Sequence, residues 1–160
     1  MKKVKTSQSS IDFSKRALTL GLALMPVVGL SQPQKPSITM WKSPTCGCCK
    51  DWEIYLQKNG FHVKAIPEGN EQIRKKLGMP IQYGSCHTAL IQGYVIEGHV
   101  PAREIKRLLI EKPKALGLAV PAMPIGSPGM DGPEYRGKKD PYDVLLITST
   151  GQSVVYQSYR

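Results

Sequence analysis

The sequence lacks an apolar run long enough to cross a membrane. The apolar stretch at 17–30 has 14 residues and contains Pro26, whereas a spanning helix needs about 20 apolar residues. Five basic residues precede this stretch and small residues follow it near Ser31, which is the order of a secretory signal peptide. We therefore expect a signal peptide at 1–31, a linker at 32–37 and an exported, periplasmic domain at 38–160, with no stable membrane span in the mature form; an uncleaved anchor is the less favoured alternative.

The sequence also lacks basic clusters with aromatic residues among them. The net charge is +10, and because the 1–31 segment holds five basic residues and one acid, the remainder carries +6. Short basic clusters occur at 74–76 and 138–139, without interleaved aromatic side chains. This pattern does not support nucleic-acid binding. It is typical of solvated faces, or of a weak docking surface for an acidic partner.

Cysteine is scarce, and its spacing is unusual. All four cysteines lie after residue 31, and three of them, Cys46, Cys48 and Cys49, fall within four residues, with Cys86 as the fourth. An even number of cysteines in an exported protein makes two structural disulfides the default expectation. The crowding argues against that default.

The hydrophobic pattern predicts alternating strands and helices up to residue 112. The expected elements are a strand at 38–42, a helix at 46–59, a strand at 61–66, a short helix between the Asn70 cap and Gly78, strands at 87–92 and 94–100, and a helix at 101–112. This order predicts an α/β, thioredoxin-like fold. Five glycines and five prolines between 117 and 141 predict a long irregular segment. Two strands around 150–151 then predict an added C-terminal β-hairpin.

Cys46 and Cys49 have the C-x-x-C spacing of a redox or metal site. Between a strand and a helix, this spacing places Cys46 at the helix N-terminus, where free N–H groups favour the thiolate. A dithiol redox site needs only two sulfurs, so Cys48 is a surplus thiol unless metal binds it. Thiolates and thioethers are soft ligands that select Cu(I). Copper binding is therefore favoured over disulfide exchange and over structural disulfides, both of which stay open.

Cys86 and His87 supply a second pair of candidate ligands. In a thioredoxin-like order, the loop before the third strand faces the C-x-x-C motif. Thioredoxins usually carry a cis-proline there, but this sequence has no proline between Ile81 and Val100. We expect Cys86 and His87 to face Cys46 across the site. The alternatives are that Cys86 is a small buried apolar residue or forms a disulfide with Cys46.

Three further side chains are candidate copper ligands. Met123 and Met130 flank a glycine- and proline-rich stretch in which methionine has no regular apolar face to fill. Packing over the core is an equally supported alternative for both. His99 lies at the end of the predicted strand pair and could reach the same pocket, or serve only a structural role.

Four motifs together resemble the CopG-type copper-resistance proteins, a family long labelled as a domain of unknown function with predicted metal binding. The motifs are MWKSPTCGCC (40–49), SCHTA (85–89), YVIEGHVPA (94–102) and AMPIGSPGM (122–130). The resemblance implies a thioredoxin-like fold, a periplasmic location and copper bound by Cys46, Cys48, Cys49 and Cys86. In some members it implies a thiolate-bridged cluster of several coppers. It also implies an oxidoreductase role, interconverting Cu(I) and Cu(II) alongside efflux systems.

The sequence thus predicts a copper-binding redox protein in copper resistance that holds several Cu(I) ions. Cys46 and Cys49 are the expected redox-active residues. One alternative is a periplasmic thiol-disulfide oxidoreductase in which Cys86 resolves the Cys46–Cys49 pair. The other is a non-redox metallochaperone that passes Cu(I) to an efflux protein. Four cysteines could also hold zinc, although the adjacent Cys48 and Cys49 fit its tetrahedral geometry poorly.

Overall fold

The computed structural model describes residues 34–160. The predicted signal peptide falls on residues that lie outside this range. The elements are β1 (Ser37–Lys42), α1 (Gly47–Lys58), β2 (His62–Ile66), α2 (Glu71–Lys76), η1 (Ile81–Tyr83), β3 (His87–Ile91), β4 (Tyr94–Gly98), α3 (Ala102–Glu111), β5 (Gly117–Val120), η2 (Pro133–Tyr135), β6 (Tyr142–Ile147) and β7 (Ser153–Tyr159). Within the described range, no helix is long and apolar enough to span a bilayer.

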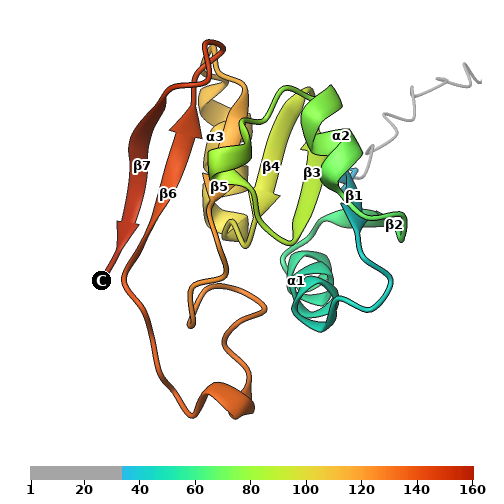
Figure 1. Ribbon diagram of the computed structural model, residues 1–160, viewed down its shortest axis with the longest axis vertical. Helices are drawn as coiled ribbons and strands as arrows, with labels where there is room; N and C mark the ends of the chain where they lie inside the picture. Colours follow the sequence, from blue (N-terminus) through green and yellow to red (C-terminus); the bar gives the residue numbers. More distant parts are fainter. Residues whose placement is uncertain (1–33) are drawn as a thin grey trace, which may run out of the picture. The chain divides into compact units, whose positions relative to one another are not determined.

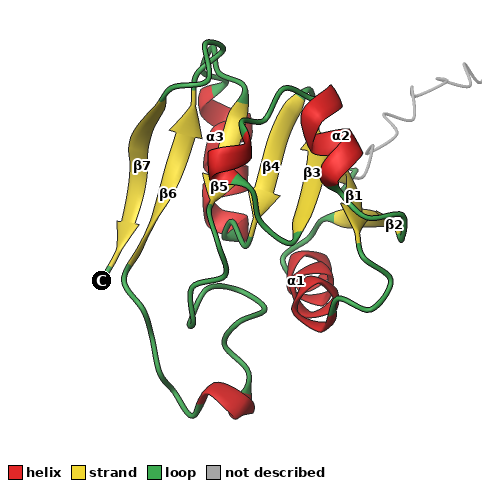
Figure 2. Cartoon of the chain, viewed as in Figure 1, coloured by secondary structure: helices red, strands yellow, loops and turns green. Residues whose placement is uncertain are grey.

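The architecture is a mixed α/β arrangement around one seven-stranded sheet (Figures 1 and 2). The strand order is β2-β1-β3-β4-β5-β6-β7. The β1–β2 and β4–β5 pairs are parallel, and the other neighbouring pairs are antiparallel. The first two parallel strands are connected by α1, and the β4–β5 pair by α3. Because β1 and β3 are adjacent and antiparallel, the segment that follows β1 and the segment that precedes β3 lie at the same end of the sheet.

The side chains of the sheet alternate between two apolar clusters. The larger cluster joins strand residues such as Ile38 and Ile96 with Trp52 of α1 and Ile105 of α3. The smaller cluster contains the alternate strand residues, with Met79 packed on them. Period-two alternation in the central strands therefore buries both faces of the sheet. The larger cluster includes Cys49, and the other three cysteines pack against it, so the cysteine site lies directly on the core.

Most of the predicted elements are confirmed, but two details are wrong. Residues 117–120 form the strand β5, which pairs with both β4 and β6 and so joins the C-terminal hairpin to the main sheet. The glycines and prolines of the segment predicted irregular structure, although the apolar run from Leu118 to Val120 forms a strand. Asn70 occupies the N-cap position of α2 without making a side-chain cap bond. Its amide is instead used in a buried network described below.

Candidate metal site

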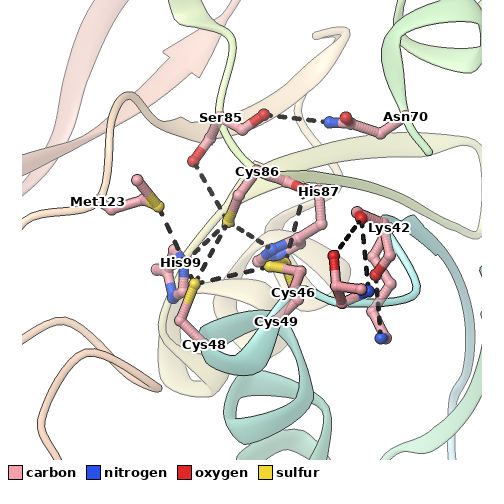
Figure 3. Close-up of a disulfide and its surroundings, with 12 residues drawn as sticks. Lys42, Cys46, Cys48, Cys49, Asn70, Ser85, Cys86, His87, His99 and Met123 are labelled. Atoms are coloured by element: carbon pink, nitrogen blue, oxygen red, sulfur yellow. Dashed lines mark hydrogen bonds between the residues drawn. A yellow bond between two sulfur atoms is a disulfide. The ribbon is translucent and has the colours of Figure 1, made fainter.

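Cys46 and Cys49 form a disulfide at the N-terminus of α1 (Figure 3). Cys46 is the N-cap residue of the helix, and Cys49 is fully buried one turn later. Cys48, between them in the sequence, is half-buried and free. The predicted alternative disulfide between Cys46 and Cys86 is not the pairing found. The strand-to-helix turn therefore presents one oxidised pair and one free thiol.

The two free thiols lie beside this disulfide. The Cys48 Sγ is 3.7 Å from the Cys46 Sγ and 3.9 Å from the Cys86 Sγ. All four cysteine sulfurs lie within 4.8 Å of one another. Cys86 comes from the loop before β3, as the topology predicted (Figure 3). The fold thus gathers four sulfurs from positions up to 40 residues apart in the chain.

Two buried histidine rings flank the Cys86 thiol. The Cys86 Sγ is 3.3 Å from the His87 Nδ1 and 3.1 Å from the His99 Nε2. On its other side, the His99 Nδ1 lies 2.8 Å from the Pro128 carbonyl oxygen. Because that carbonyl can only accept, Nδ1 carries the proton and the Nε2 lone pair faces the thiol. A histidine held by a backbone carbonyl in this way has the arrangement typical of metal-binding histidines.

Burial keeps these groups uncharged when no metal is bound. Desolvation lowers the pKa of His99 and places the pKa of His87 well below its usual value, and a neutral imidazole is the form that binds metal. Desolvation, reinforced by the neighbouring Cys48, raises the pKa of Cys86 to about 12. The His87 Nε2 is buried without a hydrogen-bond partner among residues 34–160. This donor set therefore has unused lone pairs and one proton that a metal would displace.

The structure separates the two candidate methionines. The Met123 Sδ lies 3.9 Å from the Cys48 Sγ, and the side chain is 47% exposed. Met130 instead accepts a hydrogen bond from the Tyr135 hydroxyl at 3.3 Å. Met123 is thus placed beside the sulfur cluster on its solvent side. The contact made by Met130 is to its own loop.

The glycine- and proline-rich segment packs directly on the cysteine helix. Gly129 has φ +83°, and a Cβ there would lie 2.7 Å from the Trp52 backbone nitrogen and 2.8 Å from the Cys48 carbonyl oxygen. The Trp52 ring lies 4.3 Å from the His87 ring, centroid to centroid, and its Nε1 donates to the Val100 carbonyl oxygen. The close approach at Gly129 brings the segment that supports His99 and Met123 against the first turn of α1.

A family model described as "protein of unknown function, DUF411" matches residues 83–130. A solved structure named "Copper resistance protein copG- Form 2" is 40% identical, has a TM-score of 0.72, and matches over 78% of this chain and 98% of its own. The chain belongs to the CopG family. A second CopG structure, named Form 1, gives 42% identity and a TM-score of 0.71 with the same coverage. No curated protein matches the chain.

The matched family segment and the cysteine motif at 46–49 contribute different parts of the site. Residues 83–130 include Cys86, both flanking histidines and Met123, while the motif at 46–49 precedes that segment. Both predicted histidine candidates lie against Cys86. Together with the four cysteines and Met123, they make seven of the eight predicted site residues, and Met130 is the eighth. Soft sulfur and imidazole donors of this kind suit copper.

Sequence reasoning missed the residues that hold the Cys86 loop in place. Glu97 lies in the apolar strand β4 and is fully buried. Its carboxylate accepts bonds from Arg74, Thr88 and the backbone of Ser85. A single acid within an apolar strand was the available signal, because a buried charge requires partners.

Proposed function

We propose that this CopG-family chain is an exported, periplasmic copper-binding redox protein in copper resistance. In this proposal it binds several Cu(I) ions through Cys46, Cys48, Cys49 and Cys86, with His87, His99 and Met123 as additional donors, and the β2-β1-β3-β4 portion of the sheet is thioredoxin-like. The observation that carries the proposal is the convergence of four cysteine sulfurs within 4.8 Å. The family members named as copper-resistance proteins support the choice of metal.

The state of the Cys46–Cys49 pair sets how many thiolates are available. In the disulfide form these two sulfurs are poor ligands, and Cys48 and Cys86 are the free thiols. Reduction by a thiol reductant consumes two electrons and two protons and yields two further thiols. With four thiolates, each sulfur can bridge more than one cuprous ion, which uses the surplus Cys48. The reverse step releases two electrons, enough to reduce two Cu(II) ions to Cu(I) as the disulfide closes.

The proposal also gives His99 a role, which is to accept the proton that copper would displace from Cys86. The Cys86 thiol has a pKa raised to about 12 by burial, so it stays protonated until metal binds. The His99 Nε2, 3.1 Å away, can accept that proton, and the Pro128 carbonyl fixes the ring in the required orientation. Because burial lowers the pKa of His99, the ring would hold this proton only transiently and would become a copper donor once the proton has left.

The disulfide itself favours one other candidate, a thiol-disulfide oxidoreductase. Its presence shows that Cys46 and Cys49 are close enough to cycle. Against this role, a resolving cysteine must reach the thiolate state, and burial disfavours the Cys86 thiolate. A metallochaperone would use the same ligands without redox chemistry. Voltammetry on the copper-loaded protein distinguishes that case, since a chaperone would show no reversible copper couple.

The proposed link between disulfide and copper predicts different copper capacities for the two redox states. Anaerobic titration of reduced protein with Cu(I) should give several equivalents bound, measured by competition with a chromophoric chelator. Protein with the Cys46–Cys49 disulfide closed, verified by intact mass, should bind fewer, because two of the four thiolates are absent. Equal capacity in the two states would contradict a role for this pair as copper ligands.

A further inference from the structure

All three polar groups of Ser85 are occupied by different parts of the fold. Its backbone N–H donates to the Glu97 Oε1 at 2.7 Å. Its carbonyl oxygen accepts from the Asn70 Nδ2 at 3.1 Å and from an Arg74 guanidinium nitrogen at 3.0 Å. Its hydroxyl donates to the Ala122 carbonyl oxygen and also lies 4.0 Å from the Cys86 Sγ. Ser85 is therefore tied to α2, to β4 and to the segment after β5 at the same time (Figure 3 shows the Asn70 bond).

The hydroxyl bond joins the two residues that immediately precede two sulfur donors. Ser85 is followed by Cys86, and Ala122 is followed by Met123. Ala122 has φ +60°, a conformation that a non-glycine residue adopts only when its surroundings enforce it. The bond from Ser85 thus holds the segment carrying Met123 at a fixed distance from the loop carrying Cys86.

A buried carboxylate anchors this arrangement to the sheet. Glu97 is fully buried, and its second oxygen accepts from the Thr88 hydroxyl at 2.6 Å while Arg74 donates to the first at 3.0 Å. Next to it, Gly98 has φ +70°, and an added Cβ would lie 2.7 Å from the Ser85 side chain. The glycine permits the loop to approach β4 closely enough for the Glu97 bond. Charge-assisted bonds from a rigid strand fix a loop more firmly than neutral ones.

We propose that Ser85 is a positioning residue that holds Cys86 and Met123 in place before copper arrives, with Glu97 as its anchor. The inference rests on the proposed function for its purpose, because it concerns the same copper site. Groups that bond to the supports of metal ligands typically change metal affinity by about 10–100-fold when removed. In this chain hydrogen bonds hold the loop before β3, where thioredoxins usually have a cis-proline and this sequence has no proline.

The first measurement needs no metal. In metal-free protein with the Cys46–Cys49 disulfide closed, iodoacetamide labels only Cys48 and Cys86 among the four cysteines, and peptide mass spectrometry gives the rate for each. The ratio of the Cys86 rate to that of N-acetylcysteine in a parallel reaction should rise at least about threefold in Ser85→Ala, because loop opening exposes the buried thiol. Cys48 is not used as the reference, because its Sγ lies 3.9 Å from the Met123 Sδ in the segment that Ser85 holds.

The second measurement uses the loaded protein. Reduced protein carrying Cu(I) is mixed with excess bathocuproine disulfonate, and copper release is followed by absorbance. Release from Ser85→Ala and from Glu97→Gln should be about 10-fold faster than from the wild type, with the number of bound ions unchanged. Thr150→Ala is the control. It removes a hydroxyl bond to Thr148 in the turn between β6 and β7, at the end of these strands that does not meet the Met123 segment, and should change neither measurement.

The outcomes separate this inference from the proposed function. Wild-type rates for Cys86 labelling and copper release in both variants would overturn the inference and leave copper binding intact. Faster labelling with unchanged copper release would also overturn it, since Ser85 would then order the loop without serving the metal. A wild-type protein that binds no Cu(I) would defeat the proposed function, and the labelling ratio alone would then decide whether Ser85 positions the thiol.

Discussion

Replacing Cys48 by serine should lower both the number of Cu(I) ions bound and the affinity for those that remain, the latter by more than about 100-fold. Cys48 lies between the other sulfurs, 3.7 Å from the Cys46 Sγ and 3.9 Å from the Cys86 Sγ. Its loss removes the sulfur that connects the α1 half of the site to the β3 half. Chelator competition under anaerobic conditions, with intact-mass determination of bound copper, measures both quantities.

The same variant separates copper binding from disulfide exchange. The Cys46–Cys49 disulfide does not involve Cys48, so Cys48→Ser should still close it on mild oxidation. If the protein were a thiol-disulfide oxidoreductase, Cys48→Ser would keep its full activity toward a disulfide substrate. Copper binding unchanged from the wild type would therefore favour a thiol-disulfide oxidoreductase over a copper-binding redox protein.

Gly129→Ala should destabilise the fold strongly and loosen the copper site. An alanine at φ +83° costs about 1–2 kcal/mol from backbone conformation alone. Its Cβ would also meet the Trp52 nitrogen and the Cys48 carbonyl oxygen, and such overpacking typically adds about 1–3 kcal/mol. We expect the free energy of unfolding in urea to fall by about 2–5 kcal/mol.

Gly137→Ala is the matched control for this substitution. Gly137 has φ +72° in the same segment, but an added Cβ would find nothing within 4 Å. In Gly137→Ala the free energy of unfolding should fall only by the backbone conformational cost, about 1–2 kcal/mol. Comparing the two variants isolates the contact with α1. Equal destabilisation would show that the segment does not depend on its approach to the cysteine helix.

Much of the fold was predictable because its strands and helices follow regular hydrophobic periods. The helix after the cysteine motif, the hairpin of β3 and β4, and the terminal hairpin all have clear turn signals such as Gly60, Gly93 and Gly151. β5 was not predicted, because four residues between glycine- and proline-rich flanks are too few to show a period. Its pairing with both neighbours is what stabilises it.

Site residues were predictable where the residue type itself indicates the chemistry, and less so where the role depends on three-dimensional contacts. Cys48 and Cys86 were identified as candidate ligands because a redox pair uses only two thiols, which leaves the other two to be explained by metal binding. Met123 and Met130 have the same local composition around them, and only the folded segment shows that Met123 faces Cys48 while Met130 bonds with Tyr135. The support from Ser85 and Glu97 depends on contacts between distant strands and loops, which no local pattern specifies.

The most direct test is the number of Cu(I) ions bound by the fully reduced wild-type protein. The protein is reduced and loaded under anaerobic conditions, freed of excess metal, and assayed for copper per chain, with X-ray absorption edges reporting the oxidation state. We expect several Cu(I) per chain, because four thiolates within 4.8 Å can share them. One equivalent or none would contradict the multi-copper thiolate site on which the proposed function stands.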